Sequence, residues 1–180
     1  MNHRLPEDGN GKHTLPQRKS LRLVEYDYAQ EGAYFITVCT QQKACLFGDI
    51  IGDAMVLNDA GKMVEKVWDA IPEQYPGIET DEFVVMPNHV HGILVITDGL
   101  SLPDVVHRFK SMTTNHYIRG VKQQDWRAFD RKLWQRNYFE RVIRHERELH
   151  DVRTYIANNP LKWALDHENP DYTQHPTHTP

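Results

Sequence analysis

Two apolar runs separated by a two-residue break constrain the fold of this chain more than any other feature. The runs are residues 82–86 (EFVVM) and 89–97 (HVHGILVIT), and the Pro87 and Asn88 between them are residue types that favour tight turns. Short runs rich in β-branched residues on either side of a turn predict an antiparallel hairpin. Because a hairpin this apolar has to be covered, we expect helices elsewhere in the chain to pack against it.

The remaining segments alternate between patterns typical of strands and of helices. Further strands are expected at 33–40, 46–51 and 138–143, and helices, with apolar residues every three or four positions, at 58–75, 101–117 and 146–158. The order of these segments predicts an α+β fold, an antiparallel β-sheet with helices packed on it in a ferredoxin-like sandwich.

The domain organisation follows from length and composition. With 180 residues, of which 39% are hydrophobic, the chain suffices for one domain with a core. We expect a flexible basic arm at residues 1–20, the folded domain at 21–163 and a disordered polar tail at 164–180. No stretch reaches the roughly 18 to 20 apolar residues of a membrane span, and the first residues lack a signal-peptide core, so we expect no membrane partner and a cytoplasmic location.

The charge is distributed unevenly along the chain. The net charge of −4 argues at first against a nucleic-acid partner, because Lys and Arg drive phosphate binding. However, residues 11–22 carry four bases and no acids, and residues 101–155 carry 12 bases against 7 acids. Residues 23–100 between them carry 3 bases against 13 acids. Such asymmetry is compatible with one DNA-facing surface, although ordinary solvated helix faces remain the alternative for any single residue.

His89 and His91 occupy positions i and i+2 of the expected strand at 89–97. Their side chains should lie on the same face of the strand, about 7 Å apart, and can converge on one metal ion, whereas Val90 points into the packed core. Two ordinary buried histidines are the alternative. The position directly after a turn, where a loop can leave one face open to substrate, favours the metal interpretation.

Tyr155 and Asn159 lie four positions apart near the end of the last expected helix, just before Pro160. The spacing places a phenol and an amide on one helix face. A buried tyrosine with a satisfied hydroxyl and a helix-capping asparagine are the alternatives for these two residues.

Several segments taken together resemble one family. The three most specific are 86–91 (MPNHVH), 133–144 (LWQRNYFERVIR) and 155–160 (YIANNP), joined by 18–23 (RKSLRL) and 32–40 (GAYFITVCT). They are similar to those of the REP-associated tyrosine transposases, a branch of the single-tyrosine HUH transposases, over roughly residues 17 to 163.

The resemblance implies a set of roles for residues at matching positions. His89 and His91 would be the metal-binding HUH histidines and Tyr155 the nucleophile, and by analogy Asn159 would be the third metal ligand, where several relatives have glutamine. The family's chemistry implies a divalent metal, Mg²⁺ or Mn²⁺, and cleavage of single-stranded or hairpin-forming repeat DNA through a 5′-phosphotyrosine. A phenol with a pKa near 10 is a poor nucleophile at neutral pH, which explains the need for a cation.

Aromatic and cationic residues are the expected DNA contacts, because single-stranded DNA is bound by base stacking and a cationic track. The candidates are Arg18, Lys19, Arg22, Arg108, Lys110, Trp126, Arg127, Arg131, Lys132, Trp134 and Arg136. Tyr138 and Tyr117 are rival nucleophiles, but the first belongs to an expected strand and the second ends a helix without an obvious ligand nearby.

Three other functions remain open from the sequence. One is a domesticated, non-catalytic DNA-binding regulator, the second is an HUH replication initiator or relaxase-like nickase, and the third is a generic metal phosphodiesterase. The sequence does not distinguish a monomer from a homodimer, or an active site within one chain from one shared between two.

Overall fold

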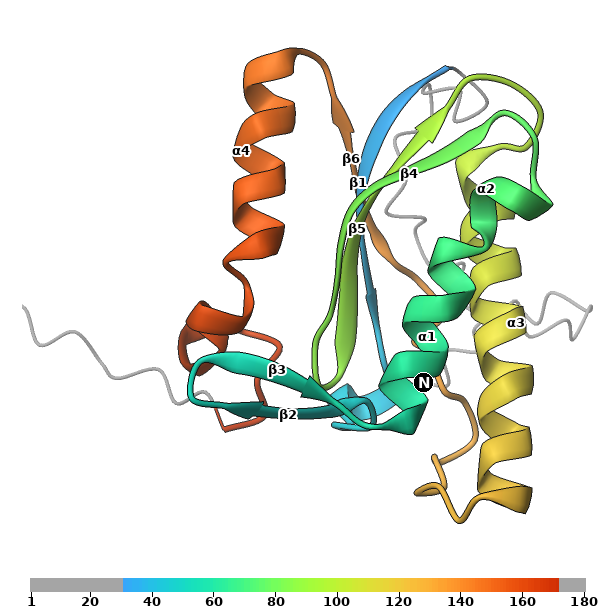
Figure 1. The fold of residues 1–180 in the computed structure, drawn as a ribbon, viewed down its shortest axis with the longest axis vertical. Helices are drawn as coiled ribbons and strands as arrows, with labels where there is room; N and C mark the ends of the chain where they lie inside the picture. The colour runs from blue at the N-terminus through green and yellow to red at the C-terminus, as the bar shows by residue number, and fades with distance from the viewer. Residues whose placement is uncertain (1–30, 172–180) are drawn as a thin grey trace, which may run out of the picture.

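A four-stranded antiparallel sheet lies at the centre of the computed structural model, which describes residues 31–171 (Figure 1). Its strands, in the order β4-β5-β1-β6, are β1 Gly32–Cys39, β4 Ile78–Val85, β5 His89–Ile96 and β6 Phe139–Ile143. The helices are α1 Asp59–Asp69, α2 Ile71–Gln74, α3 Leu102–Gln123 and α4 Glu146–Ala157. With α1 before β4 and α3 before β6, the connectivity is that of a ferredoxin-like βαββαβ unit, so the predicted fold class is confirmed.

Helices cover both faces of this sheet. In Figure 1, α1 and α3 lie on one side of the sheet and α4 lies on the other. Successive side chains of β5 point to opposite faces of the sheet, in agreement with this arrangement. Val90 and Leu94 belong to the core beneath α1 and α3. Ile93 belongs to a smaller core with Val152 and Ile156 of α4. The side chains of His89 and His91, which are in phase with Ile93, therefore belong to the face that α4 covers.

Gly92 of β5 has no side chain, and this allows α1 to pack closely on the strand. A Cβ atom at this position would lie 2.5 Å from the ring of Trp68 and 2.9 Å from the ring of Phe83. The two rings stack over the glycine, with centroids 4.3 Å apart. The close packing fixes β5 from the side opposite to the histidines.

The expected helix at 58–75 is in fact two helices. Asn58 caps α1 through its side-chain oxygen, which accepts a hydrogen bond of 2.9 Å from the backbone N–H of Gly61. The chain then breaks at Ala70, and Pro72 lies in the first turn of α2. Because proline lacks an N–H and is tolerated only in a first turn, it ends one helix and begins the next.

Several segments differ from the expectation. A separate hairpin pairs β2 Gly48–Ile51 with β3 Ala54–Leu57, a strand that was not expected from the sequence. Both turn residues, Gly52 and Asp53, have positive φ, as a type I′ turn requires. Helix α3 continues to Gln123 rather than ending near residue 117.

No helix within residues 31–171 has the length and apolar character needed to cross a bilayer.

Residues 164–171 differ from the disordered tail expected there. The 3-10 helix η2, Pro160–Leu165, follows α4, and residues 166–169 return toward β5 and make defined contacts. A polar composition suggested disorder, but it gave no indication of hydrogen bonds to a distant part of the chain. The expected arm at 1–20 and residues 172–180 lie outside the described residues.

Candidate functional site

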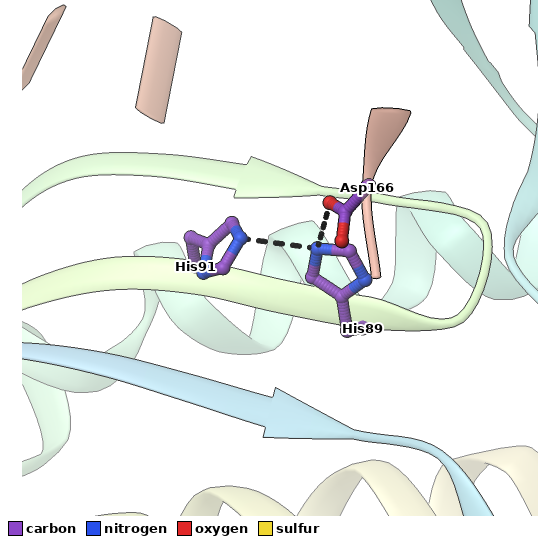
Figure 2. Close-up of side chains that lie close together, drawn as sticks. All are labelled: His89, His91 and Asp166. Carbon is purple, nitrogen blue, oxygen red and sulfur yellow. Dashed lines mark hydrogen bonds and ion pairs between the residues drawn. The ribbon is translucent and has the colours of Figure 1, made fainter. Parts of the chain in front are cut away.

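The imidazole rings of His89 and His91 meet on the face of β5 that α4 covers. The side chains are 0% and 4% exposed, and their Nε2 atoms are 3.1 Å apart (Figure 2). Asp166, from the segment after η2, places Oδ2 at 3.8 Å from Nε2 of His89. The ligand atoms of these three residues all lie within 4.8 Å of one another.

A hydrogen bond at Nδ1 orients each imidazole. Nδ1 of His89 lies 2.8 Å from Oδ1 of the buried Asn88, and Nδ1 of His91 lies 2.8 Å from Oγ1 of Thr37 on the neighbouring strand β1. Both Nε2 atoms are thereby turned toward the same point. This is the arrangement in which histidines hold metal ions, with one ring nitrogen fixed by a polar partner and the other directed at the ion.

Burial keeps both histidines uncharged at neutral pH. Loss of hydration lowers the pKa of His89 to about 4, although the nearby amide of Asn159 offsets part of this effect. Burial, together with the neighbouring His89, lowers the pKa of His91 to about 3. Neutral imidazoles have the free lone pairs that a metal ion needs.

The depressed pKa values predict that the metal-free protein loses stability in mild acid. In the unfolded chain both histidines take up protons as the pH falls through about 6.5, whereas in the folded protein they resist protonation down to about 4 and 3. Their contribution is therefore complete above pH ~6.5 and declines below it, by at most about 1.4 kcal/mol per pH unit for each histidine. Urea unfolding in EDTA at pH 7.5, 6.0 and 5.0 measures this loss.

The control for this prediction is a surface histidine. His91→Ala should make the free energy of unfolding depend less on pH between 7.5 and 5.0, and His116→Ala, at an exposed position of α3, should leave the dependence unchanged. Equal pH dependence in wild type and His91→Ala would contradict the assignment of a buried neutral imidazole.

Tyr155 lies at the open side of the histidine pair. Its hydroxyl is 3.5 Å from Nε2 of His91, and its ring packs edge-on against Phe35 at a centroid distance of 5.9 Å. The side chain remains 41% exposed. Burial raises its pKa, as do the charges of Asp166 and, to a lesser degree, Glu168, so in the absence of a cation the phenol resists ionisation.

Contacts of α4 fix the position of this tyrosine. Val152 and Ile156 on either side of it are buried against the sheet. On the outer part of the helix, Nε of Arg153 donates a hydrogen bond of 2.9 Å to Asp81 on β4. The helix that carries the tyrosine is therefore attached to the same chain that carries the histidines.

Asn159 lies directly after α4 and is only 2% exposed. Its amide is close enough to influence the pKa of both His89 and Tyr155. Among the described residues, no donor forms a hydrogen bond with its Oδ1 atom. A buried carbonyl oxygen without a donor is costly, which makes it a suitable ligand for a cation.

These residues fit a divalent metal ion. Two ligand atoms about 2.1 Å from one ion and at a right angle to each other are about 3 Å apart, close to the separation of the two Nε2 atoms, 3.1 Å. The orphaned Oδ1 belongs to Asn159, whose amide is close enough to His89 to influence its pKa. A mixed set of imidazole nitrogens and oxygens suits Mn²⁺ and is acceptable to Mg²⁺.

The rival tyrosines lie away from this site. Tyr117 is 1% exposed, and its hydroxyl donates to the backbone oxygen of Arg127. Tyr138 lies beneath the ammonium group of Lys110, which is 5.2 Å from the ring centroid. Among these tyrosines, Tyr155 is the one that the structure brings to the histidines.

The predicted base-stacking role of Trp134 is wrong. Its ring is 4% exposed and packs between Phe47 and Phe109, and its indole N–H donates to Thr113. Trp126 is partly buried in the same core. The sequence places both tryptophans in a polar loop without periodicity, so their burial could not be predicted from it.

The predicted cationic contacts divide into two groups. Lys110 donates to three backbone oxygens at 135–137, and the guanidinium of Arg108 lies 5.1 Å above the ring of Tyr75, so both have structural partners. Arg127, Arg131, Lys132 and Arg136 are exposed, as is Arg108. Arg127 also donates a hydrogen bond of 3.4 Å to the backbone oxygen of Cys45. Arg18, Lys19 and Arg22 lie outside the described residues.

Some residues of this region could not be recognised from the sequence. Asp166 belongs to the segment expected to be disordered, and Asn88 to the expected turn. Phe139 on β6 packs against Phe35 at a centroid distance of 6.1 Å and is 57% exposed. The Met-Pro-Asn segment before the histidines contained the asparagine, but its sequence does not reveal that the side chain turns back onto the ring.

A ferredoxin-like sheet with paired histidines on a central strand, facing a helix tyrosine, agrees with the transposase class that the family model identifies. Within this class, the chain belongs to the IS200-like transposase family, whose family model matches residues 34–159. The family resemblance inferred from the sequence is thereby confirmed.

Individual relatives agree with this membership. The chain is 39% identical to an uncharacterised protein of Haemophilus influenzae, over 84% of this chain and 93% of the relative. It is 23% identical to a second protein of that organism, which has the provisional name REP-associated tyrosine transposase, over 76% of this chain and 74% of the relative.

A solved structure supports the fold. It is that of a REP-associated tyrosine transposase bound to a REP hairpin, with a TM-score of 0.57 and 19% identity, over 79% of this chain and 74% of that one. At this identity the likeness concerns the fold, which is the same arrangement of helices on an antiparallel sheet.

Proposed function

We propose that this protein is a metal-dependent single-stranded DNA endonuclease and strand transferase, which cleaves hairpin-forming repeat DNA through a 5′-phosphotyrosine at Tyr155. The observation that carries the proposal is the position of Tyr155, whose hydroxyl is 3.5 Å from Nε2 of His91 and whose side chain remains partly exposed. A nucleophile at an open edge, beside buried metal-binding groups, can be reached by a polymer that is too large to enter a pocket.

The reaction is a transesterification at phosphorus. The Tyr155 oxygen forms a bond to phosphorus, its proton passes to solvent, and the bond between phosphorus and the 3′ oxygen breaks. The leaving oxygen takes up a proton and becomes a 3′-hydroxyl, while the 5′ phosphate remains on the tyrosine. Because one ester replaces another, the reverse attack by a 3′-hydroxyl can rejoin the strand or transfer it to another.

The residues of the proposed site have different roles in this reaction. His89, His91 and Asn159 would hold Mg²⁺ or Mn²⁺, and a bound ion supplies positive charge to the phenolate and to the phosphate in the transition state. Asn88 and Thr37 keep the imidazoles oriented. Phe35 stacks on His91 and supports the Tyr155 ring, so the attacking oxygen keeps its position.

Single-stranded or hairpin DNA is the proposed partner. Family membership supports a DNA substrate, and the structural relative bound to a REP hairpin supports this form of it. The exposed cations at 127–136 and the basic residues of the arm are proposed contacts to the phosphates. The proposal implies a cytoplasmic protein that associates with the nucleoid when bound to DNA.

The test of this function is detection and mapping of the covalent intermediate. The protein is incubated with 5′- and 3′-labelled single-stranded DNA that contains a hairpin, with Mn²⁺, Mg²⁺ or EDTA. We expect an adduct that survives denaturation, carries only the 3′ label, requires the metal and maps by mass spectrometry to Tyr155. Binding without any adduct would replace this proposal with a non-catalytic DNA-binding regulator, and cleavage without an adduct would replace it with a metal phosphodiesterase.

Phe139 is expected to provide the base-stacking surface that Trp134 does not. Its exposed ring lies on β6 next to Phe35, the residue that also supports Tyr155. Stacking of one base on an aromatic ring contributes about 1–3 kcal/mol, so Phe139→Ala should weaken binding of single-stranded DNA about tenfold. Fluorescence anisotropy measures the affinity, and Phe139→Trp should retain it. Equal affinity of the alanine variant and wild type would contradict this role.

A further inference from the structure

We propose that Asp166, in the segment that follows η2, is an additional ligand of the metal ion held by His89 and His91. The inference rests on the metal centre of the proposed function and extends it to a residue that the family resemblance does not include. Figure 2 shows its carboxylate beside the His89 ring, at the nitrogen that also faces His91, although Asp166 lies 75 positions after His91 in the chain.

The spacing of the atoms supports an ion between them rather than a direct contact. Oδ2 of Asp166 is 3.8 Å from Nε2 of His89, beyond hydrogen-bond length, and the ligand atoms of the three residues lie within 4.8 Å of one another. Atoms that share one ion at about 2.1 Å lie between about 3 and 4.2 Å apart in octahedral geometry, so only a small adjustment is needed.

The carboxylate of Asp166 is held in its orientation. The backbone N–H of Glu168 donates a hydrogen bond of 2.8 Å to Oδ1, and this leaves Oδ2 to face His89. The Asp166 side chain is only 14% exposed. A fixed carboxylate of low exposure loses little further conformational freedom when it binds an ion.

The segment itself is attached to the base of the metal site. The side-chain amide of Asn88 donates a hydrogen bond of 2.6 Å to the backbone oxygen of Glu168, and the ammonium group of Lys43 donates one of 2.6 Å to that of His167. The Oδ1 atom of the same Asn88 is the partner of His89. One asparagine therefore positions both a histidine ligand and the segment that carries Asp166.

A carboxylate changes the chemistry of the donor set. Two imidazoles and an amide are neutral, and the addition of Asp166 supplies a negatively charged oxygen, the type of ligand that Mg²⁺ and Mn²⁺ prefer. Affinity for such ions increases with the charge of their ligands. Asp166 is therefore expected to strengthen binding of the ion in the absence of DNA.

The test measures binding of Mn²⁺ itself, without DNA. Electron paramagnetic resonance titrates free Mn²⁺ against the full chain as wild type, Asp166→Asn, Asp166→Glu, Asp171→Asn and His91→Ala. We expect Asp166→Asn to weaken binding about tenfold or more, Asp166→Glu to restore part of the affinity, and Asp171→Asn, the same change at an exposed position, to leave it unchanged. Urea unfolding in EDTA identifies any variant that is not folded.

The outcomes separate this inference from the proposed function. Wild-type affinity in Asp166→Asn, combined with loss of binding in His91→Ala, would overturn the role of Asp166 and leave the histidine site intact. Wild-type affinity in His91→Ala as well would overturn the metal centre itself. Equal weakening in Asp166→Asn and Asp171→Asn would reduce the effect to general electrostatics and would also overturn the role of a ligand.

Discussion

Replacement of Tyr155 by phenylalanine is expected to remove the covalent adduct and DNA cleavage entirely, while DNA binding stays within about twofold of wild type. The change deletes the one oxygen proposed to attack phosphorus and keeps the ring that packs against Phe35. Because Tyr155 is partly exposed and the contact of its hydroxyl with Nε2 of His91 is as long as 3.5 Å, loss of the hydroxyl should change the free energy of unfolding by less than about 1 kcal/mol.

The matched control is Tyr138→Phe, which removes a hydroxyl from a partly buried tyrosine beneath Lys110. Gel separation of the labelled adduct and anisotropy of the same oligonucleotide are measured for both variants. An adduct that persists in Tyr155→Phe would exclude Tyr155 as the nucleophile. Loss of the adduct in Tyr138→Phe as well would indicate that the assay reports folding rather than chemistry.

Replacement of His91 by alanine is expected to lower the rate of cleavage more than about a hundredfold and to weaken Mn²⁺ binding. His91 contacts three parts of the site, since its Nδ1 meets Thr37, its Nε2 meets His89 and the same Nε2 lies beside the Tyr155 hydroxyl. Without it, the cation that would stabilise the phenolate loses a ligand, and the pKa of Tyr155 remains raised by burial. Single-turnover cleavage over a range of Mn²⁺ concentrations measures both effects.

The control for this variant is His150→Ala, which changes an exposed histidine on the same helix as Tyr155. It should cleave at the wild-type rate. Recovery of the His91→Ala rate at high Mn²⁺ would indicate that His91 acts only in affinity, whereas a low rate at saturating Mn²⁺ supports a role in the transition state. A His91→Ala rate equal to wild type at all concentrations would exclude His91 from the site.

The elements that carry the site could be predicted because their patterns are local. The alternation of side chains along β5 predicted that His89 and His91 lie on one face, and the four-residue spacing of Tyr155 and Asn159 predicted that these two lie near each other. The fold class followed from the order of strands and helices along the chain. These features depend on residues that are close together in the chain, where periodicity is informative.

The parts that could not be predicted depend on distant contacts. Asp166 belongs to a polar segment whose position is fixed by hydrogen bonds to Lys43 and Asn88, more than 75 positions away. The composition of the segment does not reveal these hydrogen bonds. Trp134 was expected to be exposed because the residues around it are polar, yet it pairs with the end of β1 and packs into the core. The roles of Asp166 and Trp134 needed the three-dimensional structure.

In the described structure, α4 packs on the sheet of its own chain through Val152 and Ile156, and Arg153 pairs with Asp81, which brings Tyr155 to His91 within one polypeptide. We propose that this arrangement also cleaves DNA. The initial cleavage should therefore follow first-order kinetics, with a rate constant that does not change when the protein is diluted. A chain that acts through Tyr155 can hold only one broken DNA end on that residue at a time. An exchange between two strands would then proceed as successive cuts and resealings by one molecule, or would require two molecules that meet on the DNA.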